Sequence, residues 1–457
     1  MNFQSALKTS FLYVLSLIAY TALGQGQEDI PVYSLEQCIE FALANNQDIK
    51  NASLEEALAK AQVGQTISEG LPQITGSAEI SNNVIIPVSF LPAFFFDSSI
   101  PPDDGRFVPV EFSQKYAGAA GVSLNQLIFD GSYFVGLQAA KTYKELSAKA
   151  HIKTKIDVVE AVTKAYYTAL INKERTTLLD QNFARLDSLL RETTVMFDNG
   201  FAEKIDVDRI KVQFNNLKVE RSKIERLLET SYLLLKYQMG MDVYTPIALA
   251  DQIADITLEV SPQDEGEFDY SDRIEYSQME TNRKLAALDL KNNKVQYLPK
   301  ISAFAGIGAN MSTNFSDEIF DFKDRWFENA AIGARLTLPI FDGLLKSYKI
   351  QSNRVQIQQI ENQFVRIKNS IELEKSTAKI NLMNSLETLE AQEETLELAA
   401  EVFRITKIKY QEGVGSNLEV LDAETSFKEA ETNYYGALYD ALISKVELDK
   451  ALGILYR

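Results

Sequence analysis

The apolar residues of this 457-residue chain follow two alternating periodicities. Residues 34–67 place apolar side chains at helical spacing from Leu35 onward, and Ser34 precedes them as a candidate N-cap. Beyond a Leu-Pro pair at 71–72 the period falls from 3.6 to 2, which is typical of a strand. The same change follows the Leu-Pro pair at 298–299. The pattern predicts a helix followed by a strand at two places in the chain.

A second strand is predicted in each half, at about residues 116–128 and 327–339. Each closes a hairpin with the strand before it. Each has about 11 to 13 residues, the length of a tilted strand that crosses the apolar core of a bilayer. One face of these strands is mostly Ala, Ile, Val and Leu, which also suits a sheet in a water-soluble protein. The strands alone leave both interpretations open.

Two very long helices are predicted at residues 131–197 and 343–410, because neither stretch contains a proline. Each would be about 100 Å long at 1.5 Å per residue. Return helices are expected at 205–238 and 418–452. An ordinary soluble domain has no core of that length, so these helices must pack on one another as a coiled-coil-like tube or bundle.

The sequence contains an internal repeat. Three segments of the first half recur in the second half in the same order: residues 71–83, 121–131 and 196–220 match residues 298–310, 333–343 and 409–433. Such internal similarity indicates a duplication. We expect a first repeat at 25–240, a linker at 241–272 and a second repeat at 273–457.

An export signal is expected at residues 1–24, where Lys8 precedes an apolar run and small residues. Beyond it, no segment offers the roughly 18 to 20 consecutive apolar residues of a membrane helix, so strands must span any membrane. Four strands cannot close a barrel, and an open edge in lipid leaves backbone groups unpaired. Two copies would give eight strands with a filled interior, whereas three would give twelve with room for a water path. The pattern therefore suggests a mainly α fold with β-strands and a trimer of pseudo-sixfold order.

Composition excludes several classes of protein. The net charge of −18 makes nucleic acid and anionic lipid surfaces poor partners. His151 is the sole histidine and Cys38 the sole cysteine, which excludes a histidine-based metal site and a disulfide. Cys38 is interpreted as a small apolar residue on a helix. No catalytic triad, phosphate-binding loop or metal-ligand spacing is present, so we expect neither an enzyme nor a cofactor.

The most specific stretch is KYQEGVGSNLEVLDAETSFKEAE, which contains Tyr410, Gly413 and the element LEVLDA at 418–423. A terminal ALG follows at 451–453. With these elements in this order, the chain resembles the TolC-like outer-membrane efflux proteins over residues 25–457.

The resemblance implies a homotrimer with a twelve-stranded barrel in the outer membrane, four strands from each chain, continued by a long α-helical barrel in the periplasm. It implies a passive exit duct in contact with outer-membrane lipid. The duct would dock to a periplasmic adaptor (membrane fusion) protein and an inner-membrane pump, in efflux or in type I secretion. The linker would belong to a mixed belt around the helical barrel. The nature of the cargo, whether drug, metal, lipid or protein, stays open.

Two glycine-bearing turns, at 197–204 and 410–417, join the long helices to their return helices. Their glycines permit left-handed or turn geometry. The resemblance places both turns at the periplasmic tip, and apolar residues exposed there suit contact with another protein. The expected adaptor-contact residues are Gly200, Phe201, Ala202, Gly413, Val414 and Gly415.

A candidate gate follows the second turn. Glu419 and Asp422 lie three apart and therefore on one face of the return helix. A threefold axis would bring six carboxylates around a narrow entrance, where they attract cations. The resemblance implies an aspartate pair at these positions and a closing hydrogen-bond network that includes Tyr410. Glu419 departs from that pattern, as does Gly415, where a basic partner can occur. Acids that favour the helix dipole are the alternative interpretation.

Other features leave alternatives open. Asp206 and Asp208, near the first turn, are lesser candidates for the entrance. Residues 83–112 form a long apolar connection that suits either an extracellular lid or a lipid-contacting collar. Trp326 suits either the membrane interface or a simple loop. A periplasmic coiled-coil adaptor or structural spacer is the rival class of protein, but it gives the strand pairs no purpose.

Overall fold

The computed structural model describes residues 30–253 and 268–456, so the expected export signal lies outside the described residues. The chain divides into two compact units. The sheet unit comprises Leu54–Lys149 and Gln278–Val365. The described residues of the helix unit are 30–53, 150–253, 268–277 and 366–456.

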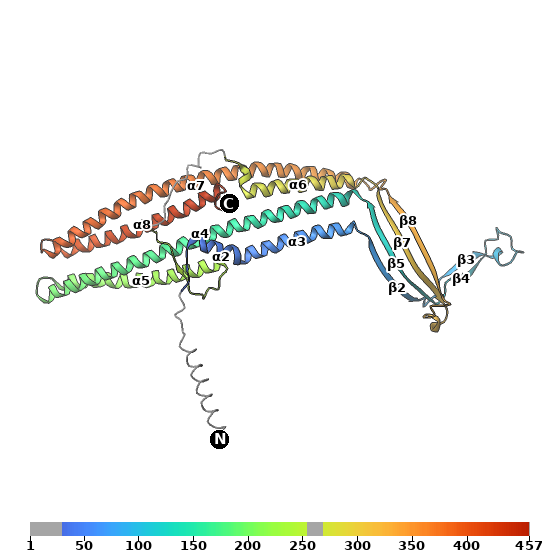
Figure 1. Cartoon of the computed structure of the whole chain (residues 1–457), viewed down its shortest axis with the longest axis horizontal. Coiled ribbons are helices and arrows are strands. Elements are labelled where there is room, and N and C mark those ends of the chain that lie inside the picture. The colour runs from blue at the N-terminus through green and yellow to red at the C-terminus, as the bar shows by residue number, and fades with distance from the viewer. Residues whose placement is uncertain (1–29, 254–267, 457) are drawn as a thin grey trace, which may run out of the picture. The chain divides into compact units, whose positions relative to one another are not determined.

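The sheet unit is organised around four antiparallel strands in the order β2-β5-β7-β8 (Figure 1). Their bounds are β2 Gln73–Asn82, β5 Tyr116–Phe129, β7 Lys300–Thr313 and β8 Trp326–Thr337. Both predicted hairpins are confirmed, and β5 pairs with β7 to join them into one sheet. The last strand ends two residues earlier than expected, before Pro339, which has no amide hydrogen to donate. Strands β2 and β8 are the two edges of this sheet.

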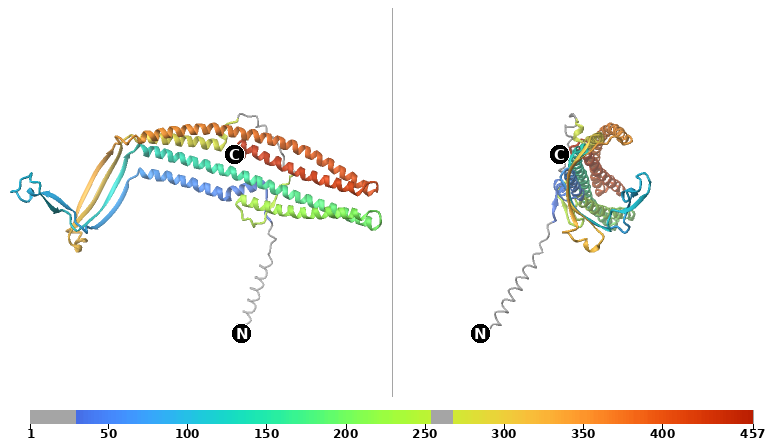
Figure 2. Two further views of the ribbon diagram at one scale, coloured as in Figure 1. Left: turned by 180° about the vertical axis from the view of Figure 1, so that it is seen from behind. Right: turned by 90° about the vertical axis from the view of Figure 1, so that its right-hand side faces the viewer.

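The connection at residues 83–112 contains a second, two-stranded sheet. Strand β3, Val88–Pro92, pairs with β4, Phe107–Glu111, and a short 3-10 helix, Ala93–Phe95, follows β3. We call residues 83–112 the ribbon. It leaves from the end of β2 that is remote from helix α3, Gln47–Glu69 (Figures 1 and 2).

The prediction of one continuous helix at residues 34–67 is wrong. The structure has two helices, α2 at Leu35–Asn45 and α3, which begins at Gln47. Asn46 interrupts them, because its Oδ1 accepts a hydrogen bond from the Asp48 amide at 2.8 Å and its Nδ2 donates to the Gln238 carbonyl at 2.8 Å. Asn46 thus caps the second helix from within the amphipathic pattern. The predicted N-cap Ser34 is confirmed by a complete capping box with Gln37.

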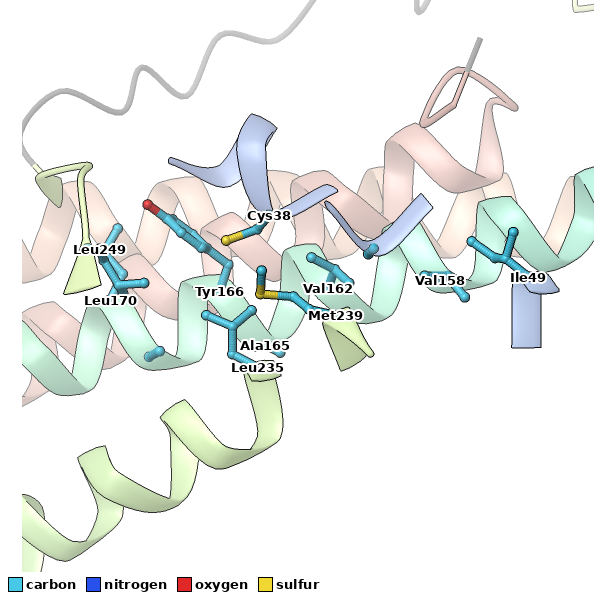
Figure 3. Close-up of a cluster of buried hydrophobic side chains, with 12 residues drawn as sticks. Cys38, Ile49, Val158, Val162, Ala165, Tyr166, Leu170, Leu235, Met239 and Leu249 are labelled. Atoms are coloured by element: carbon cyan, nitrogen blue, oxygen red, sulfur yellow. The ribbon is translucent and has the colours of Figure 1, made fainter. Parts of the chain in front are cut away.

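A hydrophobic cluster at α2 forms one core of the helix unit (Figure 3). Cys38, Tyr166 and Met239 are fully buried and lie beside one another there. Burial raises the pKa of the Cys38 thiol to about 12, so this cysteine packs as an apolar residue, as expected. The Tyr166 hydroxyl donates to Asp251 Oδ2 at 2.7 Å.

A small parallel pairing lies next to this core. It joins β1, Val32–Tyr33, to β6, Ala248–Leu249. Strand β6 lies in the expected linker, of which residues 254–267 fall outside the described residues.

Four long helices complete the chain together with α6, Ile274–Val295. Their bounds are α4 Gly131–Asp198, α5 Lys204–Met239, α7 Leu345–Gln411 and α8 Asn417–Ala451, which confirms the predicted long and return helices. Helix α7 starts two residues later than expected, because Gly343 and Leu344 both have positive φ. In the helix unit, a second hydrophobic cluster takes residues from α4, α5, α7 and α8. These helices therefore pack on one another, as the pattern predicts.

No helix within the described ranges is both long and apolar enough to cross a membrane.

Candidate functional site at the two helix turns

Both turns between long helices have the same backbone design. Gly200 and Gly413 have φ of 80° and 75°, in the left-handed region that favours glycine. The residue after each glycine closes the turn, because the Phe201 amide donates to the Met196 carbonyl at 2.8 Å and the Val414 amide donates to the Lys409 carbonyl at 3.0 Å. These bonds form Schellman motifs that satisfy the last carbonyls of α4 and α7.

Gly415 has a different role from the other two glycines. Its φ is not positive, so the expectation of turn geometry does not account for it. A Cβ at this position would lie 3.1 Å from both Lys409 Cβ and the Tyr410 amide nitrogen. A side chain at this position would therefore crowd the end of α7, which favours glycine there.

Two apolar side chains project from these turns. Phe201 is 82% exposed and Val414 is 79% exposed. Ala202 and Gly415 are half-buried beside them. Phe201 and Val414 are thus the most exposed large apolar side chains of the two turns.

The candidate acids lie at the start of the return helices. Glu419 belongs to a capping box: Ser416 Oγ accepts from the Glu419 amide at 3.3 Å, and Glu419 Oε2 accepts from the Ser416 amide at 3.4 Å. Asp422 is exposed one turn further along α8. Asp206 has the corresponding capping position on α5, opposite Glu203, and Asp208 is exposed. A carboxylate at such a position also interacts favourably with the helix dipole.

Tyr410 connects α7 to α4. Its side chain is buried, and its hydroxyl lies 3.3 Å from Thr193 Oγ1. Next to it, Gln411 Nε2 donates to Glu192 Oε2 at 3.4 Å. The structure therefore brings Tyr410 against α4 and leaves Glu419 and Asp422 on the exposed side of α8.

A buried polar cluster between α4 and α8 was missed from the sequence. Asn182 Nδ2 donates to Glu431 Oε2 at 2.9 Å. Arg185 lies between two carboxylates, with its Nη2 3.4 Å from Glu431 Oε2 and its Nε 3.7 Å from Glu424 Oε1. The guanidinium also lies 4.8 Å from the centre of the Phe427 ring. We call Asn182, Arg185, Glu424 and Glu431 the interhelix cluster.

The interhelix cluster places two buried acids around one half-buried base. Burial raises the pKa of both Glu424 and Glu431, and the nearby Arg185 charge opposes that rise. Glu424 Oε2 is buried without a hydrogen-bond partner among the described residues. The available signal was the spacing of the two acids, seven apart on one face of α8. Acids at such spacing are as common on a solvated helix face, so the pattern alone did not identify the cluster.

The Outer membrane efflux protein family model matches residues 38–240 and 275–454. The chain is 24% identical over 434 residues to the probable efflux pump outer membrane protein TtgC of Pseudomonas putida KT2440, covering 92% of this chain and 83% of that protein. It is 22% identical over 354 residues to the outer membrane protein TolC of Vibrio cholerae, covering 74% of this chain and 77% of that protein.

The fold of this chain is similar to that of solved outer-membrane channel structures. A crystal structure of CusC has a TM-score of 0.74 at 17% identity, and the match covers 93% of this chain and 92% of that one. The outer membrane protein VceC of Vibrio cholerae has a TM-score of 0.70 at 17% identity, covering 92% of this chain and 96% of that one.

The fold and the family match define a channel protein of the outer membrane. This chain belongs to the outer membrane efflux protein family. It is an outer-membrane channel of the tripartite efflux type, and it extends into the periplasm.

Proposed function

We propose that three copies of this chain form a passive exit duct, gated at its periplasmic tip. The export signal at 1–24 would direct the chain out of the cytoplasm. The mature chain would consist of repeats at 25–240 and 273–457, joined by a linker at 241–272. The duct carries out no chemical reaction. The energy for transport comes from its partner pump.

The observation that carries this proposal is the pair of free edges on the sheet. Strands β2 and β8 run in opposite directions, because each neighbouring pair in the order β2-β5-β7-β8 is antiparallel. Strand β8 of one copy can therefore pair with β2 of the next in the same antiparallel sense. Closure in this way leaves no unpaired edge in lipid. Three copies give twelve strands, which leave a water path, whereas two copies give eight and a filled interior.

The entrance is assigned to the acids of α8. Around a threefold axis, Glu419 and Asp422 supply six carboxylates, which favour cations over anions. Tyr410 helps to hold the entrance closed through its contact with Thr193.

Docking is assigned to the two turns. Three copies present six turns, each with a highly exposed apolar side chain, Phe201 or Val414. A periplasmic adaptor that covers them buries this apolar surface and links the duct to an inner-membrane pump. A periplasmic spacer would leave the four-stranded sheet without a role, so the exit duct is the better account.

Purification from membranes tests the assembly. We expect a protein that requires detergent, has three times the chain mass by light scattering after correction for detergent, and runs as a trimer on gels before heating. A water-soluble monomer would contradict the proposal.

A further inference from the structure

The ribbon exposes apolar side chains that the described residues of its own chain leave uncovered. On one face of the β3–β4 pair, Phe90 lies opposite Pro109, and Pro92 lies opposite Phe107. Phe90 is 65% exposed, and Phe107 is similarly exposed. A lone two-stranded ribbon is at best marginally stable in water. The ribbon therefore needs a partner surface.

A second aromatic surface lies at the same end of the sheet. It is the β7–β8 loop, residues 314–325, which joins the two strands there (Figures 1 and 2). Phe315, Phe320 and Phe322 are exposed in this loop, and Phe322 stacks on Trp326, the first residue of β8. Trp326 is held by a hydrogen bond from its indole to the Ile319 carbonyl at 3.1 Å.

Strand order separates these two surfaces within one chain. The ribbon begins directly after β2, and the loop ends directly before β8, so the two strands that lead to them are opposite edges of the sheet. Three strand spacings of about 4.8 Å each, or about 14 Å, separate those edges. In the proposed closed assembly, β2 of one copy is the direct neighbour of β8 in the next. One spacing then separates the strand that leads to the ribbon from the strand that the next copy's loop enters.

Charge argues against a lipid headgroup surface as the partner. In the ribbon, Asp97, Asp103, Asp104 and Glu111 outnumber Arg106. In the loop, Asp317, Glu318, Asp321 and Asp324 outnumber Lys323 and Arg325. Both segments are therefore net acidic and would be repelled by anionic headgroups. The same charges would also repel the two segments from each other, so a contact between them must rest on burial of their exposed aromatic side chains.

We propose that the ribbon of each copy packs against the β7–β8 loop of the adjacent copy, aromatic against aromatic, and so fastens neighbouring copies together at the extracellular end of the duct. This inference rests on the proposed assembly through β2 and β8. It assigns residues 83–112 to contact between copies, and not to a lipid-contacting collar or an extracellular lid.

Cross-linking between copies of two kinds tests the contact. One kind carries Phe90→Cys and the other carries Phe320→Cys, both in a Cys38→Ala background, and the two are co-expressed. A short bismaleimide then joins them only if the ribbon of one copy lies next to the loop of another. We expect cross-linked dimers of the mixed sample on denaturing gels. Either kind alone, in which only like positions could be joined, is the matched control.

The outcomes separate this inference from the proposed function. Trimers that form normally but give no mixed cross-link, with Phe107→Cys and Phe322→Cys tried as the alternative pair, would overturn the inference and leave the duct intact. A fluorescent label on the thiol of the Phe90→Cys variant provides a second readout. Protection of this label from an aqueous quencher but not from a lipid-borne one would identify a lipid collar, and would also overturn the inference. Absence of trimers would overturn both.

Discussion

The two helix turns have the same backbone conformation, but the return helices that follow them differ in charge and burial at corresponding positions. The turn after α4 and the turn after α7 each have a left-handed glycine and a capping-box acid. Behind the first turn, α5 has exposed lysines at Lys211 and Lys218. At the corresponding positions behind the second turn, α8 has the buried Glu424 and Glu431. The duplicated chain therefore places buried acids at these positions of one return helix, against α4, whereas the corresponding positions of the other return helix are exposed.

This difference breaks the pseudo-sixfold symmetry that the repeat suggests. The contacts of Tyr410 with Thr193 and of Arg185 with the α8 acids both join the second hairpin to α4 of the same copy. In the proposed duct, separation of α8 from α4 would disrupt the interhelix cluster, so the second hairpin carries more of the closing interactions.

Removal of the base from the interhelix cluster should have the largest effect. Arg185→Met removes the guanidinium that lies between two buried carboxylates, and the loss of one partner from a buried pair costs about 3 to 5 kcal/mol. We expect faster hydrogen exchange along α8 and a lower temperature of trimer dissociation. Lys211→Met on the first hairpin is the control, and it should change stability by less than about 0.5 kcal/mol. Equal effects of the two variants would remove the distinction between the hairpins.

The turn glycines should have an intermediate effect, equal in both hairpins. Gly200→Ala and Gly413→Ala each force a side chain into the left-handed region, at about 1 to 2 kcal/mol. Thermal unfolding of the detergent-solubilised protein measures this cost. A much larger loss from Gly413→Ala than from Gly200→Ala would show that the backbone of the turns, and not only the helices behind them, differs between the repeats.

The two buried acids of α8, Glu424 and Glu431, should make stability depend on pH. Because burial raises the pKa of Glu424 and Glu431, the folded chain holds protons more tightly than the unfolded chain does. Stability should therefore fall as pH rises from about 4.3, the ordinary value of a glutamate, through the raised pKa values. Glu424→Gln should flatten this dependence, as followed by thermal unfolding between about pH 4.5 and 7. A slope unchanged in the variant would contradict the burial of a titrating carboxyl at this position.

The exposed turn residues should have the smallest effect on stability and a clear effect on transport. Phe201→Ser with Val414→Ser should change stability by about 0.5 kcal/mol or less, because both side chains are exposed. Export by cells that rely on this variant should fall, since the docking surface loses its apolar side chains. Normal export by a stable double variant would place the partner contact elsewhere.

The sequence predicts most of the architecture because periodicity is local. The change from a 3.6 to a 2.0 period marks β2 and β7, the first strand of each hairpin, and the absence of proline marks the long helices. The break at Asn46 was not predicted, since an asparagine within an amphipathic pattern does not by itself indicate a cap. The pairing within the ribbon was missed because its prolines and aromatic runs disguise the strand period.

Features that depend on residues far apart in the chain were harder to predict from the sequence. Arg185 and Glu431 are 246 positions apart, and only the packing of α4 on α8 brings them together. Glu419 and Asp422 were recognised from spacing and resemblance, and the structure adds that Glu419 also caps its helix. Their role in a gate remains a proposal.

Single-channel recording in a planar bilayer tests the central claim of an acidic exit duct most directly. Glu419→Gln with Asp422→Asn removes both charges while the glutamine preserves the capping box, so the helix start stays intact. We predict that the native protein conducts and prefers cations, and that the double variant conducts with much of that preference lost. A native protein without conductance, or a selectivity unchanged in the variant, would contradict the account.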